Sequence, residues 1–274
     1  MSAKRERLLD LIRSFDSCAV AFSAGIDSTV LAKAAQVALG DRAVAVTGVS
    51  PSLPAGELAE ARRLAAQIGI RHEVIATEEF SSPDYLRNDP NRCYHCKTEL
   101  YTQIERIAPQ LHVAVVFNGA NLDDLGDFRP GMRAASERQV RSPLAECGFT
   151  KEEIRALAIE WQLPIWDKPA MPCLASRVAY GEEVSPERLE MIDRAERFLR
   201  ERGLRTVRVR YHKGNLARLE VPVDAIEQIA QSPLRHELVE YLRSLGFQFV
   251  TLDLQGFRSG SLNVLLPSEA LRTL

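Results

Sequence analysis

The sequence predicts an α/β fold, with a parallel sheet covered by helices in the first part of the chain and a smaller α+β unit after it. Three observations support this prediction. Short apolar runs alternate with segments of helical period between residues 18 and 161. The first apolar run leads directly into small and polar residues at 23–28. From about residue 181 the order changes to a long helix followed by two adjacent strands. Alternating strands and helices are typical of parallel sheets with both faces covered.

Length and composition narrow the class of protein. The 274 residues, 46% hydrophobic and 26% charged, suit a globular enzyme with one large domain or two smaller ones. The formal net charge of −2 gives no global attraction to nucleic acid or to a membrane. Residues 1–15 lack a signal-peptide core, and no run approaches the roughly 20 apolar residues of a membrane span. We therefore expect a cytoplasmic protein, in which five cysteines serve as thiols, metal ligands or catalytic groups rather than as disulfides.

The first part is expected to alternate strands with helices. The strands are short and apolar, as in AVAVTGV and HVAVVFN. The helices show an apolar face with start and stop signals, such as Thr150 before one helix and Gly69 after another. The expected strands cover 18–22, 43–49, 72–76 and 112–118, and the expected helices cover 29–39, 57–68, 98–107 and 151–161.

The second part starts with a long helix over 187–201, which Ser185 and Pro186 open and Gly203 ends. Apolar alternation and helical period predict the remaining elements. These are strands at 206–211, 217–221 and 248–254, and helices at 224–231 and 234–245. The expected domains are 1–180, which carries the parallel sheet, and 181–274, a unit for substrate binding or oligomerisation.

The stretch from Ser23 to Ser28 leaves a buried strand through small polar residues and enters a helix at once. Gly25 permits a close backbone approach or a positive φ, and the hydroxyls of Ser23 and Ser28 can form hydrogen bonds. The unpaired N–H groups of the following helix favour an anion. Asp27 suits such a cradle if it holds a metal ion or completes a polar network. The alternative is an ordinary strand-to-helix turn with an N-cap, since loops of glycine and serine are common.

At these residues the chain resembles the N-type ATP pyrophosphatases. Their pyrophosphate (PP) loop reads Ser-Gly-Gly-x-Asp-Ser and follows the first strand, and here Ala24 replaces the first glycine. The resemblance implies a PP-loop ATP pyrophosphatase domain that splits ATP between the α- and β-phosphates, leaves AMP on a substrate oxygen and releases pyrophosphate. Asp27 and Ser28 are expected to act with Mg²⁺. The residues expected to bind the nucleotide are Ser23, Ala24, Gly25, Asp27, Ser28 and Thr29.

Cys93 and Cys96 form a Cys-x-x-Cys pair in NDPNRCYHCK. Such a pair can be a redox dithiol, half of a zinc site or part of an iron–sulfur site. Cys173 is the remaining candidate partner, and three thiolates can hold three irons of a [4Fe–4S] cluster and leave the fourth iron open to a ligand such as sulfide. In the alternatives, Cys93 and Cys96 form a labile disulfide beside a packed Cys173, or Cys173 alone gives up its sulfur. Cys18 is expected in the core, and Cys147 has no assigned role.

Longer segments resemble the LarE family of ATP-dependent sulfur transferases. The similarity covers nearly the whole chain and is carried by NRCYHCK, NGANLDDLGDFRPGMRAASE, RSPLAECGFTKEEIRALA, KPAMPCLASRVAYGEEVSPERL, VRVRYHKGNLARLEV and GFRSGSLN. It implies that ATP adenylates a carboxylate of pyridinium-3,5-biscarboxylic acid mononucleotide and that sulfur then displaces AMP. The product is a thiocarboxylate, an intermediate of nickel-pincer nucleotide cofactor biosynthesis.

Members of the LarE family use either one sacrificial cysteine or a [4Fe–4S] cluster on three cysteines. The three-cysteine pattern of this chain favours the cluster, with Cys93, Cys96 and Cys173 as its ligands. These three residues and Asp27 are therefore the expected catalytic residues.

Other polar residues are expected near the same edge of the sheet. Lys97 can neutralise a phosphate, or it can be an ordinary solvated lysine. Asn121, Asp123 and Asp124 follow the strand expected to end at residue 118, so they reach the crevice beyond the strand ends. They are expected to bind nucleotide or metal.

Four arginines are candidates for binding the negative groups of the substrate. Arg177 lies four residues after Cys173. Arg208 and Arg210 stand two apart on a strand and therefore share a face. They form either an exposed alternation or a paired guanidinium site for the mononucleotide phosphate. Arg258, in GFRSGS, is a similar candidate. Such arginines can also complete the site of a neighbouring subunit, because the resemblance implies a homo-oligomer.

The resemblance leaves other functions open. tRNA thiolases also combine a PP loop with three cysteines, but they bind a polyanion, which usually needs a basic patch. The net charge of −2 argues against that function. A nucleotide-binding redox module without turnover would cycle the Cys93–Cys96 pair. Amide-forming relatives do not explain three cysteines. The expected partner is thus a small-molecule mononucleotide, with no nucleic acid and no membrane.

Overall fold

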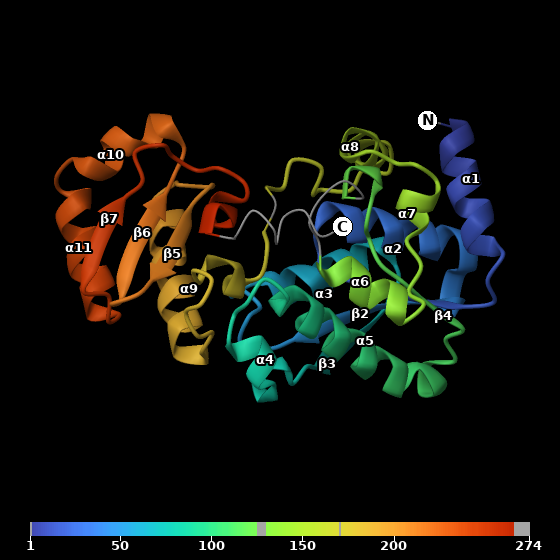
Figure 1. The fold of residues 1–274 in the computed structure, drawn as a ribbon. Coiled ribbons are helices and arrows are strands. Elements are labelled where there is room, and N and C mark those ends of the chain that lie inside the picture. The colour runs from blue at the N-terminus through green and yellow to red at the C-terminus, as the bar shows by residue number, and fades with distance from the viewer. Residues whose placement is uncertain (1, 125–129, 170, 266–274) are drawn as a thin grey trace. The chain divides into compact units, whose positions relative to one another are not determined.

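The structure, a computed structural model, describes residues 2–124, 130–169 and 171–265 (Figure 1). The chain forms two compact units. The first comprises residues 1–81 and 93–171, and the second comprises residues 82–92 and 172–274. The expected division at residue 180 stays a prediction. By compactness, the second unit begins at Pro172 and also includes a short segment from the first half of the chain.

The helices and strands follow the alternation that the sequence predicts. Residues 1–81 and 93–171, with Arg92 at the border, form α1 (Ser2–Arg13), β1 (Cys18–Ala21), α2 (Ile26–Leu39), β2 (Ala43–Val49), α3 (Glu57–Ile68), β3 (Arg71–Ala76), α5 (Arg92–Leu111), β4 (Val115–Phe117), α6 (Pro130–Glu137), α7 (Pro143–Glu146) and α8 (Lys151–Glu160). The second unit contains α4 (Pro83–Leu86), α9 (Pro186–Arg200), β5 (Arg208–His212), β6 (Leu216–Glu220), α10 (Ile226–Ala230), α11 (Leu234–Ser244) and β7 (Phe249–Leu252). No helix in the described part of the chain is both long and apolar enough to cross a membrane.

The sheet of the first unit is parallel, as predicted, with the strand order β3-β2-β1-β4. Val20 in β1 pairs with Ala45 in β2 on one side and with Phe117 in β4 on the other. The chain therefore moves outward from β1 to β3 and then crosses to the opposite side of β1. In such a sheet, ligands bind in the crevice at the carboxyl ends of the two strands beside the reversal, which here are β1 and β4.

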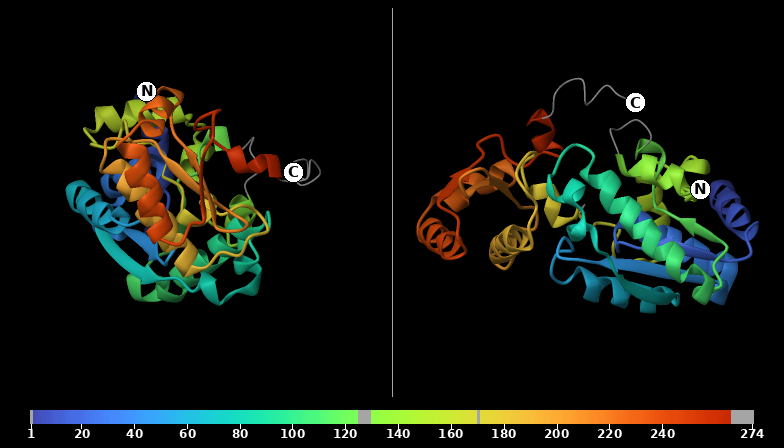
Figure 2. Two further views of the ribbon diagram at one scale, coloured as in Figure 1. Left: turned by 90° about the vertical axis from the view of Figure 1, so that its left-hand side faces the viewer. Right: turned by 60° about the horizontal axis from the view of Figure 1, so that its bottom comes forward.

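Helices cover both faces of this sheet (Figure 1 and Figure 2). Cys18 and Val20 belong to the core shared with α1, α2, α3 and α8, whereas Ala19 belongs to the core shared with α5 and α6. This alternation follows from the two-residue period of a strand, and burial on both faces explains why β1 is apolar. Cys18 is fully buried, which confirms it as a core residue.

Several element boundaries differ from the prediction, among them the starts of α2, α5 and β4. α2 begins at Ile26 rather than at residue 29, so Asp27 and Ser28 lie in its first turn. α5 begins at Arg92 rather than at residue 98, so the Cys-x-x-Cys pair lies on a helix. β4 is shorter than expected because His112, at the expected start of the strand, has a φ of 55°, outside the strand region.

The second unit has a sheet of its own, with the order β5-β6-β7. β5 and β6 are antiparallel, whereas β6 and β7 are parallel. Asn88 is one of the residues that connect the segment 82–92 to this unit, and it is fully buried. Nδ2 of Asn88 donates to the carbonyl groups of Val178, Ala179 and Glu182 at distances between 2.9 and 3.3 Å. One side-chain amide thus ties a distant segment into the unit.

Candidate functional site

The loop after β1 starts from a backbone position that the sheet holds in place. The N–H of Phe22 donates to the carbonyl of Val46 at 2.8 Å. The carbonyl of Phe22 accepts from the buried Thr47 hydroxyl at 2.8 Å, and Nε2 of His72 lies 2.8 Å from the same hydroxyl. The single hydroxyl proton of Thr47 is donated to the carbonyl of Phe22, so the Thr47 oxygen accepts a hydrogen bond from the protonated Nε2 of His72. Burial, and next the charge of Arg62, lower the pKa of the half-buried His72.

The turn itself is made by Ala24 and not by Gly25. Ala24 has a φ of 55°, in the left-handed region, and is fully buried. Gly25 is extended, with φ −78° and ψ 162°, and a Cβ there would meet the Ser23 hydroxyl at 3.4 Å, an ordinary contact. Of the two possibilities that the sequence left open for Gly25, a close backbone approach or a positive φ, the positive φ is not used. The left-handed region costs alanine roughly 1–2 kcal/mol, which explains why the loops that this chain resembles carry glycine at the position of Ala24.

The hydroxyl groups of the loop form one network. The Ser28 hydroxyl donates to the carbonyl of Gly25 at 3.0 Å, accepts from the N–H of Ser23 at 3.3 Å and lies 3.2 Å from the Ser23 hydroxyl. The Thr29 hydroxyl also donates to the Gly25 carbonyl, at 2.8 Å. These contacts hold the loop against the first turn of α2, where the N–H groups form the positive end of the helix dipole. The structure thus brings the predicted nucleotide residues of the loop together.

Asp27 faces Asn121 from the neighbouring strand end. Nδ2 of Asn121, which is fully buried, donates to Oδ1 of Asp27 at 3.0 Å. The N–H of Asn121 donates to Oδ2 of Asp124 at 3.2 Å. Burial raises the pKa of Asp27; the hydrogen bond from Asn121 opposes this rise, and the charge of Asp124 adds to it. Asn121 thus donates hydrogen bonds to both Asp27 and Asp124, whose carboxylate oxygens are of the kind that divalent cations favour.

Asp123 and Asp124 connect this strand end to α8. Oδ2 of Asp123 accepts from the N–H of Lys151, the first residue of α8, at 2.8 Å, and the N–H of Asp123 donates to Oδ1 of Asn121 at 3.0 Å. Asp124 is buried, and its Oδ1 lies 3.2 Å from Nζ of Lys151. Asp123 therefore has a structural contact at the start of a helix, while Asp124 lies nearer to Asp27.

Two further residues touch the loop and are not among the predicted site residues. Gly119 follows β4, and a Cβ there would lie 2.9 Å from the backbone nitrogen of Ser28, closer than such atoms approach. Nζ of Lys168 donates to the carbonyl of Ala24 at 3.3 Å and to Oε2 of Glu57 at 2.9 Å. The sequence does offer a signal for Gly119, because a glycine that follows an apolar run indicates a close backbone approach at the end of a strand. Lys168 is 144 residues from Ala24, and no local pattern connects them.

Cys93 and Cys96 lie in the first turns of α5, with Cys93 exposed and Cys96 half-buried. Residues three apart on a helix lie on the same side, so both sulfurs can serve one centre. Cys173 is half-buried and precedes a short turn, Leu174–Arg177, in the second unit. Among the described residues, no three His, Cys, Asp or Glu side chains are grouped closely enough to hold a metal ion. The three-thiolate cluster stays a prediction.

Lys97 follows Cys96 on α5. Its side chain packs beside α6, since a Cβ placed on Gly131 would lie 3.0 Å from Cγ of Lys97. This contact fixes the stem of the side chain rather than its charged end. The expected contact of Lys97 with a phosphate stays a prediction.

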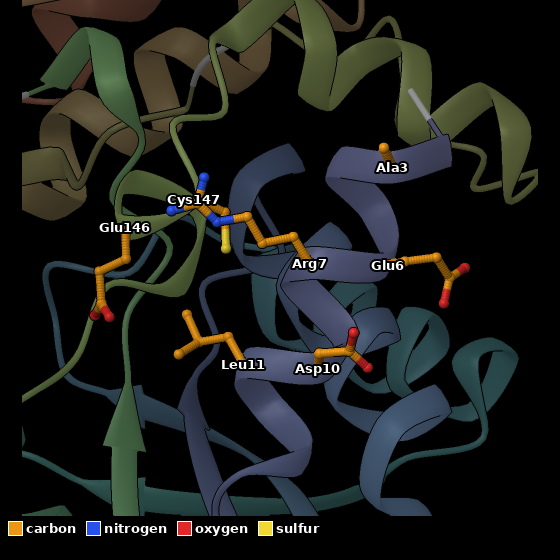
Figure 3. A pocket seen from close by; sticks show the side chains of 7 residues that line it. All are labelled: Ala3, Glu6, Arg7, Asp10, Leu11, Glu146 and Cys147. Carbon is orange, nitrogen blue, oxygen red and sulfur yellow. The ribbon is translucent and has the colours of Figure 1, made fainter.

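Cys18 and Cys147 differ from the other three cysteines because both are buried. Burial raises the pKa of Cys18 to about 12 and also raises the pKa of Cys147. Cys147 lines a hollow of about 550 Å³ together with residues of α1, among them Glu6 and Arg7 (Figure 3). The thiolate is the nucleophilic and metal-binding form of cysteine, so these two thiols are poor candidates for sulfur chemistry.

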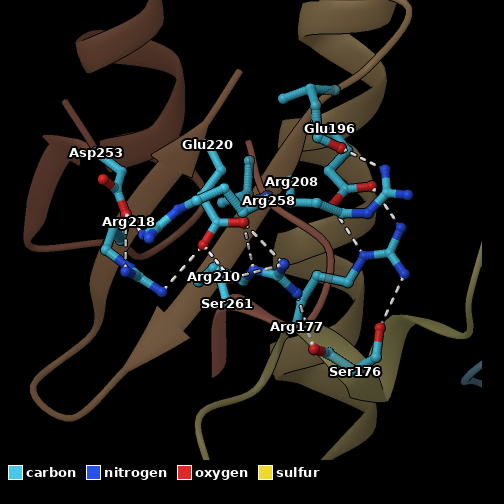
Figure 4. Close-up of polar contacts among 12 residues, drawn as sticks. Ser176, Arg177, Glu196, Arg208, Arg210, Arg218, Glu220, Asp253, Arg258 and Ser261 are labelled. Atoms are coloured by element: carbon cyan, nitrogen blue, oxygen red, sulfur yellow. Dashed lines mark hydrogen bonds and ion pairs between the residues drawn. The ribbon is translucent and has the colours of Figure 1, made fainter. Parts of the chain in front are cut away.

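The four candidate arginines lie in the second unit, in or beside one cluster of charged side chains (Figure 4). Arg177 is fully buried, and its Nε and Nη2 donate to the two carboxylate oxygens of Glu196 at 2.9 and 3.1 Å. Glu196 is also fully buried and accepts from the N–H of Val209 and from Arg200. Burial opposes the ionisation of Glu196, yet Arg177 and the other donors hold its pKa below the ordinary value.

Arg208 and Arg210 are buried, so the exposed alternation considered for them is wrong. Arg210 donates to Oε2 of Glu220 from Nε at 3.0 Å and from Nη2 at 2.8 Å. The Ser261 hydroxyl accepts from Arg210 and donates to Glu220. Burial, and next the charge of Arg177, lower the pKa of Arg208 to about 10. Arg208 therefore stays charged at neutral pH.

Arg258 has a more exposed side chain, 48% accessible, and lies 3.9 Å from Asp253, which also binds Arg218. Among the described residues labelled in Figure 4, five arginines accompany three carboxylates. The cluster is therefore positive overall. The roles of these arginines in substrate binding stay predictions.

Comparison with known proteins gives relatives along the whole chain. No protein-family model matches it. An uncharacterized protein of Synechocystis sp. is 47% identical over 97% of this chain and 99% of its own length. The pyridinium-3,5-bisthiocarboxylic acid mononucleotide synthase of Lactiplantibacillus plantarum is 36% identical over 100% of this chain and 98% of its own length. One subunit of the glutamine-hydrolyzing GMP synthase of Archaeoglobus fulgidus is 26% identical over 72% of this chain and 67% of its own length.

Proposed function

Because the chain belongs to the pyridinium-3,5-bisthiocarboxylic acid mononucleotide synthase family, we propose that it is an ATP-dependent sulfur transferase. Its substrate is pyridinium-3,5-biscarboxylic acid mononucleotide, and its product, a thiocarboxylate, leads to the nickel-pincer nucleotide cofactor. The observation that carries this proposal is the loop 23–28, whose Asp27 binds Asn121 at the carboxyl ends of β1 and β4.

The reaction needs ATP because a carboxylate oxygen is a poor leaving group and AMP is a good one. In the first step a carboxylate oxygen of the substrate attacks the α-phosphorus, the bond to the bridging oxygen breaks, and pyrophosphate leaves with the electron pair. In the second step sulfur attacks the acyl carbon, and AMP leaves. The N–H groups of α2 and the hydroxyls of Ser23 and Ser28 bind the negative charge that collects on the departing pyrophosphate.

The residues beside the loop fit a magnesium ion. Asp27 and Asp124 offer carboxylate oxygens, which Mg²⁺ prefers and usually combines with phosphate oxygens, and Asn121 orients the carboxylate of Asp27. The raised pKa of Asp27 is the value without a cation, and a cation at this position favours the ionised carboxylate. When bound, Mg²⁺ neutralises phosphate charge during the first step.

Cys93, Cys96 and Cys173 are the proposed sulfur-handling residues. Their thiols are exposed or half-buried, whereas the remaining two cysteines are buried and have raised pKa values. Thiolates are the donors that iron–sulfur clusters use. These three thiolates would hold a [4Fe–4S] cluster, which would supply the sulfide for the second step. If the protein carries no cluster, Cys173 is the sulfur donor.

The arginine cluster is proposed to bind the phosphate of the mononucleotide. Its excess of positive charge and its forked guanidinium donors suit a phosphate group. Arg258 is more exposed than Arg177, Arg208 and Arg210, so it is the first candidate for direct contact. In a homo-oligomer this contact can be made to the substrate of a neighbouring copy.

The proposal is tested by AMP formation from ATP and pyridinium-3,5-biscarboxylic acid mononucleotide. Asp27→Asn should slow AMP formation by about 100-fold or more, because it removes a carboxylate that is proposed to hold the magnesium ion beside the phosphates. Asp41→Asn is the matched control, since Asp41 is exposed in the turn before β2. Unchanged turnover in Asp27→Asn contradicts the assignment. AMP formation that requires tRNA instead of the mononucleotide favours a thiolase, and none with either substrate favours a redox module.

The sulfur source is tested by anaerobic purification followed by measurement of iron and acid-labile sulfide. Close to four irons per chain in the parent, lost in each of Cys93→Ala, Cys96→Ala and Cys173→Ala, supports the cluster. An iron-free protein with full activity contradicts the cluster and makes Cys173 the donor. In that case one turnover converts Cys173 to dehydroalanine, which mass spectrometry detects as the loss of H₂S.

A further inference from the structure

A lysine from the end of the first unit reaches the phosphate loop. Nζ of Lys168 lies 3.3 Å from the carbonyl oxygen of Ala24 and 2.9 Å from Oε2 of Glu57. The side chains of Lys168 and Glu57 are 18% and 15% exposed. These contacts place a largely buried positive charge directly beside the turn that is proposed to receive the phosphates of ATP.

Glu57 has a second source of stabilisation besides Lys168. It is the first residue of α3, and the preceding Gly56 has no side chain with which to cap that helix. The positive end of a helix dipole stabilises a carboxylate at this position. Glu57 therefore does not depend on Lys168 alone, and the ammonium group can turn toward another anion at small cost.

Among the contacts of the described residues, the donor count of Lys168 leaves capacity for a ligand. An ammonium group carries three N–H donors, and the contacts with Ala24 and Glu57 use two of them. We propose that Lys168 is a pyrophosphate-binding residue and that Glu57 limits how tightly the site holds pyrophosphate. This inference rests on the proposed function, because it adds residues to the pyrophosphate site of the same loop.

The two side chains act on the product with opposite signs. Pyrophosphate gains negative charge as ATP is split, and Lys168 attracts that charge through a short, shielded contact. Glu57 neutralises part of the charge of Lys168 and repels the product. The pair thus stabilises the departing pyrophosphate during adenylation, while the binding of pyrophosphate stays weak enough for its release.

The test is calorimetric binding of inorganic pyrophosphate, in the presence of magnesium, to the full-length protein. Lys168→Met should weaken binding about 10- to 100-fold, the effect of one charged hydrogen bond, and Lys168→Arg should retain most of the affinity. Glu57→Gln should tighten binding several-fold, but should change it less than twofold in the Lys168→Met background. Lys33→Met is the matched control, because Lys33 lies on α2 and donates to Gln36 instead of the loop.

The outcomes separate this inference from the proposed function. Equal affinity in the parent and in Lys168→Met overturns the inference and leaves the proposed function standing. If the parent binds no pyrophosphate, the proposed function is wrong and the inference falls with it. If circular dichroism shows that Lys168→Met does not fold, Glu57→Gln decides alone: tighter binding supports the inference, and unchanged or weaker binding contradicts it.

Discussion

The phosphate loop of the first unit consists mainly of neutral polar groups, whereas the arginine cluster of the second unit consists of charged side chains. The hydroxyl groups and backbone of residues 23–29 form neutral hydrogen bonds with one another. Asp27, the one ionisable residue of this stretch, binds Asn121, and Lys168 contacts the carbonyl of Ala24 from outside the loop. In the cluster, Arg177 and Glu196 are both fully buried and bind each other through two hydrogen bonds. The loop keeps donors for an incoming group, whereas the cluster contains buried ion pairs, such as Arg177 with Glu196, that are already formed without a ligand.

Because of this difference, we expect the loop to determine ligand affinity and the cluster to determine the stability of the fold. A loop that a ligand completes is best made of small neutral groups, because they lose little hydration before the ligand arrives. A buried ion pair has already lost its hydration, so each partner depends on the other. Substitutions in the loop should therefore reduce activity more than stability, whereas substitutions in the cluster should first reduce stability.

The largest expected effect on stability comes from the cluster. Arg177→Met leaves the fully buried Glu196 without its two-hydrogen-bond partner, which should lower the free energy of unfolding by about 3–5 kcal/mol. Urea denaturation measures the change. Arg13→Met, which removes an exposed pair with Asp10, should change stability by about 1 kcal/mol or less. Similar losses in the two variants would remove the contrast between the regions.

Gly119→Ala should affect both stability and activity. Its Cβ would lie 2.9 Å from the backbone nitrogen of Ser28, so the first turn of α2 must shift, at a cost of about 1–3 kcal/mol. AMP formation should fall with it, since the shift displaces the loop. Gly25→Ala is the control for stability, because its Cβ meets only an ordinary contact and its φ suits alanine. A larger loss of stability in Gly25→Ala than in Gly119→Ala would contradict this account.

The stability of the fold should depend on pH through the ionisation of Asp27. Its pKa is raised in the folded protein, first by burial, so the native state holds this proton more tightly than the unfolded state does. The stability contributed by the proton is lost as pH rises from the ordinary carboxyl value of about 4 through the folded pKa. Asp27→Asn should therefore raise the melting temperature at pH 7 and have little effect at pH 3. A lower melting temperature at pH 7 would mean that the ionised carboxylate stabilises the fold.

The smallest expected effect is that of Ala24→Gly. Glycine relieves the left-handed φ of 55°, worth roughly 1–2 kcal/mol. It also gives up a fully buried methyl group, worth about 0.8 kcal/mol, and makes the unfolded chain more flexible, which costs about 0.4–1 kcal/mol. The contributions nearly cancel, so thermal unfolding should change by a degree or two at most. A strong destabilisation would show that the methyl group supports the loop.

The parallel sheet and the loop could be predicted from the sequence because both depend on neighbouring residues. The order of apolar runs and helical periods defines the strands, and the small residues after β1 mark the loop directly. Asn121 was predictable for a similar reason, since it follows a strand whose carboxyl end lies beside that of β1. The helix Glu57–Ile68 needed only its terminal signals to be placed correctly.

The contacts between distant segments could not be predicted in this way. The bond from Lys168 to Ala24 joins residues 144 positions apart, and the arginines of the cluster gave no sign of their carboxylate partners. Nor does the sequence show that Ala24 takes the left-handed position, because residue type favours Gly25 for it. Tertiary packing decides these features, and a prediction based on local pattern does not include it.

The burial of Asn88 has a consequence for how the molecule is made. Its amide binds backbone carbonyls at 178–182, about ninety positions further along the chain. A ribosome adding about 5–20 residues per second needs roughly 5–20 s to reach them. During this interval the side-chain amide of Asn88 lacks these acceptors, while residues 93–171 of the first unit emerge. A polypeptide released before residue 182 keeps this amide without its full set of acceptors, and we expect proteases to degrade such a chain faster than the complete one.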